Sequence, residues 1–177
     1  MKKFNKTYLV FSLLLLAVAG IALIVQHRGS SKYIFNEGKA HGTYYHATYL
    51  QPQGIDLQKK LEESMHRIDL SMSTFQPQSI ISRINRNDET VRTDIYFETV
   101  FRTAQEVSAK TNGAFDITVA PLVNAWGFGF GSESRKQSPN IDSIMLFIGY
   151  KKISLKQHQL VKADKRIMLD ASAIAKG

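Results

Sequence analysis

The sequence predicts one α+β domain that follows an N-terminal apolar segment, and three patterns lead to this prediction. Residues 38–50 alternate aromatic and β-branched side chains with a period of two, which is typical of a strand. Residues 56–72 and 94–110 instead carry apolar side chains three and four positions apart, which is typical of helices. Short strand-like segments return at residues 152–155, 159–162 and 166–169.

Composition supports a single globular domain and excludes several classes of protein. The chain has 177 residues, of which 44% are apolar and 21% are charged, as in ordinary folded domains. Lys and Arg outnumber Asp and Glu by 23 to 15, but three of these lysines precede the first apolar segment. The remaining excess of positive charge suits an anionic ligand or an anionic membrane surface. The sequence has no compact block of Lys and Arg that would predict nucleic-acid binding. The absence of cysteine excludes disulfides, thiolate metal sites and a cysteine nucleophile.

The N-terminus has the pattern of a membrane-targeting segment. Residues 1–6 are basic, and residues 8–25 form a run of 18 positions without a charged side chain. Such a run can just span a bilayer, and its basic flank should stay in the cytoplasm. We expect residues 1–25 to form an uncleaved anchor helix in a bacterial inner membrane, and a cleaved signal peptide is the alternative. Residues 26–37 then form a linker, and residues 38–177 form a domain that faces the periplasm.

The first half of the predicted domain consists of a strand followed by helices. A turn rich in glycine precedes the strand, and Asp56 has the side chain of an N-cap for the first long helix. A short helical turn is expected at residues 82–88. Asp94 is the expected N-cap of the second long helix, and Gly113 provides the left-handed residue that ends it.

An extended segment should follow this second helix. Apolar residues alternate with polar ones until Pro121, so that Asp116 lies on the face opposite Phe115. Residues 132–140 are polar and predict a loop. Apolar residues spaced by three and four then predict one more helix at residues 141–148.

Aromatic residues and glycines are concentrated in residues 111–131, TNGAFDITVAPLVNAWGFGFG. Flat apolar side chains beside closely approaching backbone suit a ring-shaped ligand, although the same aromatics could also pack on the core. The WGFGFG sequence at residues 126–131 is also similar to the RNA-stacking strand of an RRM. It lacks the basic residue and the valine of that signature, which disfavours RNA binding.

Few side chains are candidates for metal ligands. His41 and His46 lie five positions apart on a predicted strand and point to opposite faces, so they cannot share a metal ion. Asp116 and Asp170 each lie at the edge of an apolar strand beside small residues, where an oxygen-ligated ion such as Mg²⁺ would bind. The alternative for each carboxylate is that it caps a turn.

Four motifs, in order along the chain, resemble those of the ApbE family of FAD:protein FMN transferases. The clearest is GAFDITVAPLV at residues 113–123, followed by WGFG at residues 126–129. The others are GT at residues 42–43, STF at 73–75 with SIISRIN at 79–85, and DASAIAKG at 170–177. The resemblance covers roughly residues 38–177.

The resemblance implies an ApbE-like (T-fold-like) domain of mixed sheet and packed helices. It also implies a protein that binds FAD together with Mg²⁺. A threonine hydroxyl of an acceptor membrane flavoprotein, such as a subunit of a Na⁺-translocating NADH:quinone reductase, would attack the phosphorus on the FMN side of the pyrophosphate and release AMP. Phosphoryl transfer depends on charge neutralisation and positioning more than on a protein nucleophile, and no catalytic side chain is assigned.

The motifs also imply roles for individual residues. Those expected to bind FAD or line the nucleotide site are His41, Phe75, Ala114, Phe115, Asp116, Asp170 and Lys176, and Ala173 is expected to offer its carbonyl to the metal. His41 stands where the family usually has Met, and Phe75 where it usually has Tyr. We further expect that replacing Asp116 with alanine weakens FAD binding or turnover far more than stability.

The family's remaining metal ligands lie in a C-terminal segment that has no counterpart in this sequence. This difference predicts a chain that is a fragment of the enzyme. The alternative function of such a fragment is a non-catalytic flavin-binding or scaffold protein.

Overall fold

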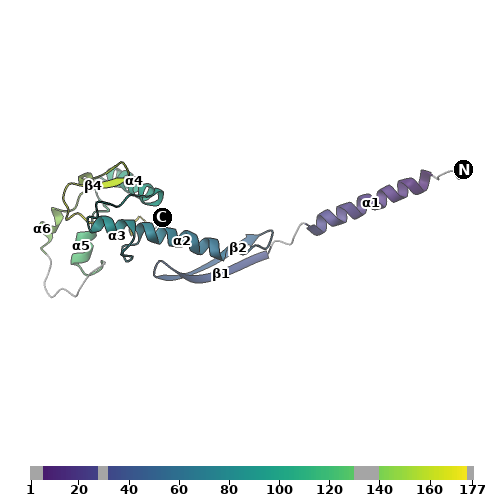
Figure 1. Cartoon of the computed structure of the whole chain (residues 1–177), viewed down its shortest axis with the longest axis horizontal. Coiled ribbons are helices and arrows are strands. Elements are labelled where there is room, and N and C mark those ends of the chain that lie inside the picture. Colours follow the sequence, from purple (N-terminus) through teal and green to yellow (C-terminus); the bar gives the residue numbers. More distant parts are fainter. Residues whose placement is uncertain (1–5, 28–31, 130–139, 175–177) are drawn as a thin grey trace. The chain divides into compact units, whose positions relative to one another are not determined.

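The computed structural model describes residues 6–27, 32–129 and 140–174. Its contacts divide the chain into two compact units, residues 1–62 and residues 63–177. Figure 1 shows the order of the helices and strands along the chain. Each unit is described here on its own.

The first unit begins with helix α1 (Lys6–His27), which includes the whole of the uncharged segment at residues 8–25. The predicted helix is therefore confirmed. The predicted transmembrane anchor is not supported, because no helix among the described residues is long and apolar enough to cross a membrane.

Strands β1 (Lys32–Ala40) and β2 (Thr43–Gln51) form an antiparallel hairpin in which every residue of one strand has a partner on the other. His41 and Gly42 form the two-residue turn, and their φ angles of 52° and 76° are the left-handed values that such a turn requires. The strand predicted at residues 38–50 is therefore confirmed, chiefly as β2.

Strand β1 corrects the predicted linker at residues 26–37. The last six residues of that range lie in the strand and pair with β2. Tyr33, Ile34 and Phe35 are aromatic or β-branched, so they favour extended backbone once a partner strand is available.

Polar side chains join the hairpin to the start of helix α2 (Gln58–Met72) within the first unit. The buried Asn36 donates its side-chain N–H to Oδ1 of Asp56 over 3.0 Å and accepts from the Tyr49 hydroxyl over 2.8 Å. Asp56 also accepts from the backbone N–H of Gln58 over 2.8 Å, in agreement with its predicted place at the start of the helix.

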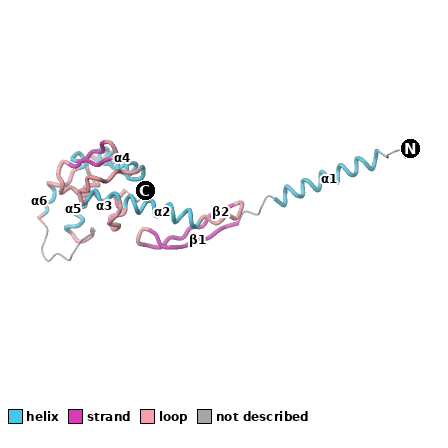
Figure 2. The backbone as a smooth tube through the Cα atoms, viewed as in Figure 1, coloured by secondary structure: helices cyan, strands magenta, loops and turns pink. Residues whose placement is uncertain are grey.

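The second unit begins within α2, and Figure 2 shows that helices and loops make up most of it. Its further elements are α3 (Ile80–Asn85), α4 (Ile95–Lys110), α5 (Ala120–Ala125), α6 (Ile141–Met145), a 3₁₀ turn η1 (Tyr150–Lys152), β3 (Ile153–Lys156) and β4 (Gln159–Lys162).

Helix α4 begins and ends where the sequence predicts. Oδ1 of Asp94 accepts from the backbone N–H of Phe97 over 2.8 Å, so Asp94 is the N-cap. Gly113 has a φ of 83°, and its N–H donates to the carbonyl of Ser108 over 2.8 Å, which satisfies one of the last carbonyls of the helix.

Most buried apolar residues of the second unit form one cluster. The members of this cluster come from α3, α4, β3, the loop between α3 and α4, and the segments around residues 117 and 167–169, whereas the buried Ala120 and Ala125 of α5 lie outside it. The cluster consists of Ile81, Ile84, Val91, Phe97, Phe101, Ala104, Ile117, Ile153, Ile167 and Leu169. Segments that are far apart in the sequence therefore share one core.

A nearly buried carboxylate, that of Glu98, connects α4 to the turn between β3 and β4. Its Oε1 atom lies 2.6 Å from Nδ1 of His158 and accepts from the Thr93 hydroxyl over 2.9 Å. Oε2 accepts from Arg102 over 3.2 Å. The hydrogen bond with His158, and then those from Thr93 and Arg102, lower the pKa of Glu98 below its ordinary value.

The described residues do not form the single mixed sheet that the resemblance implies. β3 and β4 pair only with each other, as β1 and β2 do. The last of the three short strands predicted near the C-terminus, residues 166–169, forms only an isolated parallel bridge, between Met168 and Val119. This ladder cannot continue because α5 begins at Ala120 and Pro121 lacks a backbone N–H.

Candidate functional site

The segment between α4 and α5 contains the GAFDIT motif and runs into the core of the second unit. Asn112 and Gly113 turn the chain with positive φ angles of 52° and 83°. Phe115 then packs against the apolar cluster, and Ile117 is buried within it. These two apolar contacts hold the backbone on both sides of Asp116.

Both carboxylate oxygens of Asp116 accept hydrogen bonds from the protein itself. Oδ1 accepts from the backbone N–H and the hydroxyl of Thr118, over 2.8 and 2.6 Å. Oδ2 accepts from the backbone N–H of Tyr150 over 2.6 Å, and the Thr118 hydroxyl accepts from Gly149 over 2.7 Å. Asp116 therefore caps a turn, and it joins the start of α5 to the start of η1.

The segment that leads into Asp170 lies beside the GAFDIT motif. The backbone N–H of Asp170 donates to the carbonyl of Ile117 over 2.8 Å, next to the bridge between Met168 and Val119. Two motifs that were recognised separately in the sequence, and that are far apart along the chain, are thus adjacent in the structure.

Asn85, the last residue of α3, holds this second segment in place. Its side-chain N–H donates to the carbonyl of Leu169 over 2.9 Å, and its Oδ1 accepts from the N–H of Leu169 over 2.7 Å. Both residues are buried. Sequence reasoning included Asn85 in a motif without giving it a role; a polar amide at the end of the apolar run IISRIN is the signal that could have identified it.

The carboxylate of Asp170 turns back onto its own loop. Oδ1 accepts from the backbone N–H of Ser172 over 2.8 Å and also from the Ser172 hydroxyl. Ala173 lies in the exposed turn that follows. Lys176 lies outside the described residues, so its expected place beside Asp170 in the nucleotide site stays a prediction.

Three aromatic side chains of the second unit are exposed. Trp126 is 58% exposed, Phe75 78% and Phe128 83%. The alternative in which Trp126 and Phe128 pack on the core is therefore wrong. Each exposed ring leaves roughly 2 kcal/mol of burial energy unused, and its face is accessible for contact with another group.

Close backbone packing fixes the loop that carries two of these rings. Gly127 has a φ of 82°, and a Cβ atom on Gly129 would lie only 1.7 Å from Oδ1 of Asn124. The backbone N–H of Phe128 donates to the carbonyl of Val123 over 3.1 Å. Gly127 is therefore favoured for its conformation, and Gly129 leaves room for the side chain of Asn124.

The remaining predicted site residues are Ala114 and His41. Ala114 lies in the turn after α4, where its N–H donates to the carbonyl of Thr111 over 3.1 Å. His41 lies in the turn of the hairpin in the first unit, whereas the other described site residues belong to the second.

Among the described residues, no three His, Asp or Glu side chains come together as a metal ion would require. The carboxylate of Asp116 is already occupied by N–H and O–H donors, and Ala173 offers only a carbonyl. These residues alone do not make a magnesium site.

Comparison with known proteins decides the family. Residues 41–177 match the model of the ApbE family. This chain belongs to the ApbE family. The FAD:protein FMN transferase of Haemophilus influenzae is 32% identical to it over 179 aligned residues, a match that covers 92% of this chain and 51% of that protein.

Solved ApbE structures share the fold. The flavin transferase ApbE from Vibrio cholerae matches with a TM-score of 0.73 and 29% identity, over 83% of this chain and 50% of that one. The ApbE protein from Thermotoga maritima matches with a TM-score of 0.69 and 25% identity, over 82% and 49%. This ApbE-family chain thus has the mixed α and β fold of its relatives and spans about half of their length.

Proposed function

We propose that this chain is the flavin-binding part of an FAD:protein FMN transferase. The observation that carries the proposal is the hydrogen bond from the Asp170 N–H to the Ile117 carbonyl, since it joins the two motifs expected to line the nucleotide site. The family and the names of the relatives support the same function. Flavin transfer would then depend on how these two segments hold FAD.

The arrangement suggests how the chain would hold FAD. The exposed rings of Phe75, Trp126 and Phe128 supply faces on which a flavin or adenine ring can stack. Asp116 would act mainly by fixing the backbone around it, since both of its carboxylate oxygens accept hydrogen bonds from the chain. Positioning of this kind accounts for much of the catalysis of phosphoryl transfer.

The proposed reaction needs no covalent intermediate on this chain. The hydroxyl oxygen of an acceptor threonine forms a bond to the phosphorus on the FMN side, the pyrophosphate P–O bond breaks, and AMP leaves. The hydroxyl proton is released. A requirement for Mg²⁺ is part of the proposal, because a bound divalent cation neutralises the negative charge of the pyrophosphate.

A transfer assay tests this function. The 177-residue chain is first titrated with FAD, with quenching of flavin fluorescence as the readout. It is then incubated with FAD, Mg²⁺ and a threonine-containing acceptor peptide, and covalent FMN on the peptide is measured by mass spectrometry. A peptide with alanine in place of threonine and a reaction with EDTA are the controls. If the chain binds FAD but no peptide carries covalent FMN, this result contradicts transferase activity of this chain.

A second candidate is a flavin-binding or scaffold protein without transferase activity. The absence of a cluster of metal ligands among the described residues favours it. Release of AMP by the chain, measured by chromatography, distinguishes the two, because only the transferase cleaves the pyrophosphate.

We also propose that the acceptor is a flavoprotein of a membrane redox complex, such as a subunit of a Na⁺-translocating NADH:quinone reductase, and that the domain works on the periplasmic side of a bacterial inner membrane. The basic flank before the uncharged segment at residues 8–25 supports export. An alkaline phosphatase fused to the C-terminus should be active in cells, since this enzyme needs the oxidising periplasm. An inactive fusion contradicts this location.

A further inference from the structure

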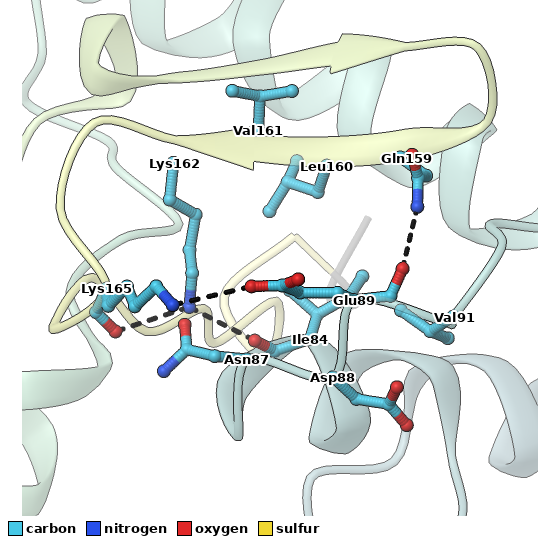
Figure 3. Close-up of a pocket in the computed structure, with 10 residues that line it drawn as sticks. All are labelled: Ile84, Asn87, Asp88, Glu89, Val91, Gln159, Leu160, Val161, Lys162 and Lys165. Carbon is cyan, nitrogen blue, oxygen red and sulfur yellow. Dashed lines mark hydrogen bonds and ion pairs between the residues drawn. The ribbon is translucent and has the colours of Figure 1, made fainter.

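Lys162, in β4, directs its ammonium group at three backbone carbonyls. Nζ donates to the carbonyls of Ile167 over 2.9 Å, Ile84 over 3.1 Å and Lys165 over 3.5 Å. Figure 3 shows the side chain extending from β4 toward the end of α3. An ammonium group has three N–H donors, so its capacity is matched by these acceptors.

Nζ of Lys162 lies at the C-terminal end of α3, where a positive charge is favourable. The last carbonyls of a helix have no donor within the helix, and they carry partial negative charge. Ile84 belongs to the last turn of α3, and Nζ of Lys162 gives its carbonyl a second hydrogen bond beside the one from the N–H of Asn87. Lys162 is half-buried, and this burial lowers its pKa to about 8.

Lys162 and Asn85 together fasten one segment to the end of α3. Lys162 binds the carbonyl of Ile167, and Asn85 binds both backbone polar groups of Leu169. The next residue is Asp170, whose N–H donates to Ile117 in the GAFDIT motif. A displacement of residues 167–169 would therefore be transmitted to the contact between the two motifs.

We propose that Lys162 is a positioning residue of the flavin site, which acts through the backbone of residues 167–170. Its effect on flavin binding rests on the function proposed above, whereas its effect on the backbone does not. Lys162 itself is not expected to touch FAD.

The chain offers a matched control and a conservative replacement. Lys165 is close in sequence and lines the same pocket, but its ammonium group is exposed and pairs only with the exposed Glu89 at 3.4 Å. The pocket has a volume of about 420 Å³. Lys162 also lines this pocket, and Lys162→Arg keeps a positive charge and N–H donors at this position.

Amide hydrogen exchange of the 177-residue chain tests the structural part. In Lys162→Met, the amides of Leu169 and Asp170 should exchange at least tenfold faster, while those of Phe101 and Ala104 in α4 stay within twofold of wild type. Lys162→Arg and Lys165→Met should stay within threefold at every one of these amides. Each of three results would overturn the proposal. The amides of Leu169 and Asp170 could exchange in Lys162→Met at the wild-type rate, or all four amides could be accelerated equally. The third is that these amides exchange as fast in Lys162→Arg as in Lys162→Met.

A flavin titration at a temperature where circular dichroism shows all variants to be folded tests the functional part. The Kd for FAD should rise at least fivefold in Lys162→Met and stay within twofold in the other two variants. A wild-type Kd in Lys162→Met overturns the positioning role. If the wild-type chain itself does not bind FAD, the proposed function fails, and the exchange experiment still decides whether Lys162 positions residues 167–170.

Discussion

Tyr150 donates its backbone N–H to Oδ2 of Asp116 over 2.6 Å, across a sequence separation of 34 residues. Thr118 supplies two further donors to Oδ1 of the same carboxylate. The residue that the sequence singles out as a flavin ligand therefore also holds the second unit together. Its replacement has consequences beyond ligand binding.

Asp116→Ala should lower the free energy of unfolding by about 2–4 kcal/mol. The substitution leaves the N–H groups of Thr118 and Tyr150 without an acceptor in a half-buried position, and hydrogen bonds to charged groups are among the stronger ones. Urea denaturation measures the change. This expectation revises the one drawn from the sequence, in which the effect falls mainly on FAD.

The matched control for this prediction is Asp142→Ala. Asp142 is exposed in the first turn of α6, so its loss should cost no more than about 0.5 kcal/mol. Unchanged stability of Asp116→Ala together with lost FAD binding would restore the purely ligand-binding role.

Asn85→Ala should lower the free energy of unfolding by about 3 kcal/mol. The substitution leaves the buried N–H and carbonyl of Leu169 without partners, and each orphaned group costs about 1–3 kcal/mol. The shift of the urea midpoint at constant slope measures it. A loss below about 1 kcal/mol would show that water replaces the amide.

Stability should fall in acid partly because Glu98 becomes protonated. Its pKa in the folded protein lies below the ordinary value, so the unfolded chain binds the proton first as the pH drops. The contribution is fully present above the ordinary glutamate pKa and is lost as the pH falls through the lower folded-state value.

Glu98→Gln tests this pH dependence. The slope of unfolding free energy against pH between about pH 5 and pH 3 should be shallower in the variant than in wild type. Glu89→Gln, at an exposed position of the same unit, should keep the wild-type slope. Identical slopes for wild type and Glu98→Gln would contradict a role of Glu98 in acid unfolding.

Trp126→Ala and Phe128→Ala should weaken FAD binding with little loss of stability. A stacked aromatic pair contributes about 0.5–1.5 kcal/mol, so each variant should raise the Kd by about threefold to tenfold. Both rings are exposed, and stability should change by less than about 0.5 kcal/mol. Flavin fluorescence and thermal unfolding provide the two measurements.

Phe97→Ala is the contrasting variant for these two rings. Phe97 is 2% exposed in the core, and its truncation should cost about 3–5 kcal/mol. An FAD affinity of Trp126→Ala and Phe128→Ala equal to wild type would exclude these rings from the flavin surface.

Local patterns predicted the two long helices well, whereas the short helix α5 at Ala120–Ala125 was not predicted. α4 follows from its apolar stripe, from the capping side chain of Asp94 and from Gly113, all of which act within a few residues. β1 was missed because its strand character depends on β2, and the segment also contains residues typical of a linker. Pairing between segments is not visible in the sequence of one of them.

The candidate site was predicted only in part for the same reason. The motifs containing Asp116 and Asp170 were recognised, but not the bond that Asp116 accepts from Tyr150 nor the amide that Asn85 provides to Leu169. These contacts join residues 34 and 84 positions apart. The sequence left open whether Asp116 binds a ligand or caps a turn; the bonds from Thr118 show that it caps a turn, and its role toward a ligand stays a prediction.

The pairing of Asn85 with Leu169 also has a consequence for the order of folding. Closing a loop of 84 residues costs an unfolded chain about 4 kcal/mol of entropy, whereas α4 forms from neighbouring residues. During synthesis, α3 and α4 can emerge from the ribosome and begin to fold before Leu169 exists. The contact between residues 167–170 and the GAFDIT motif should therefore form last, because the core that Ile167 and Leu169 help to build cannot be completed before these residues are synthesised.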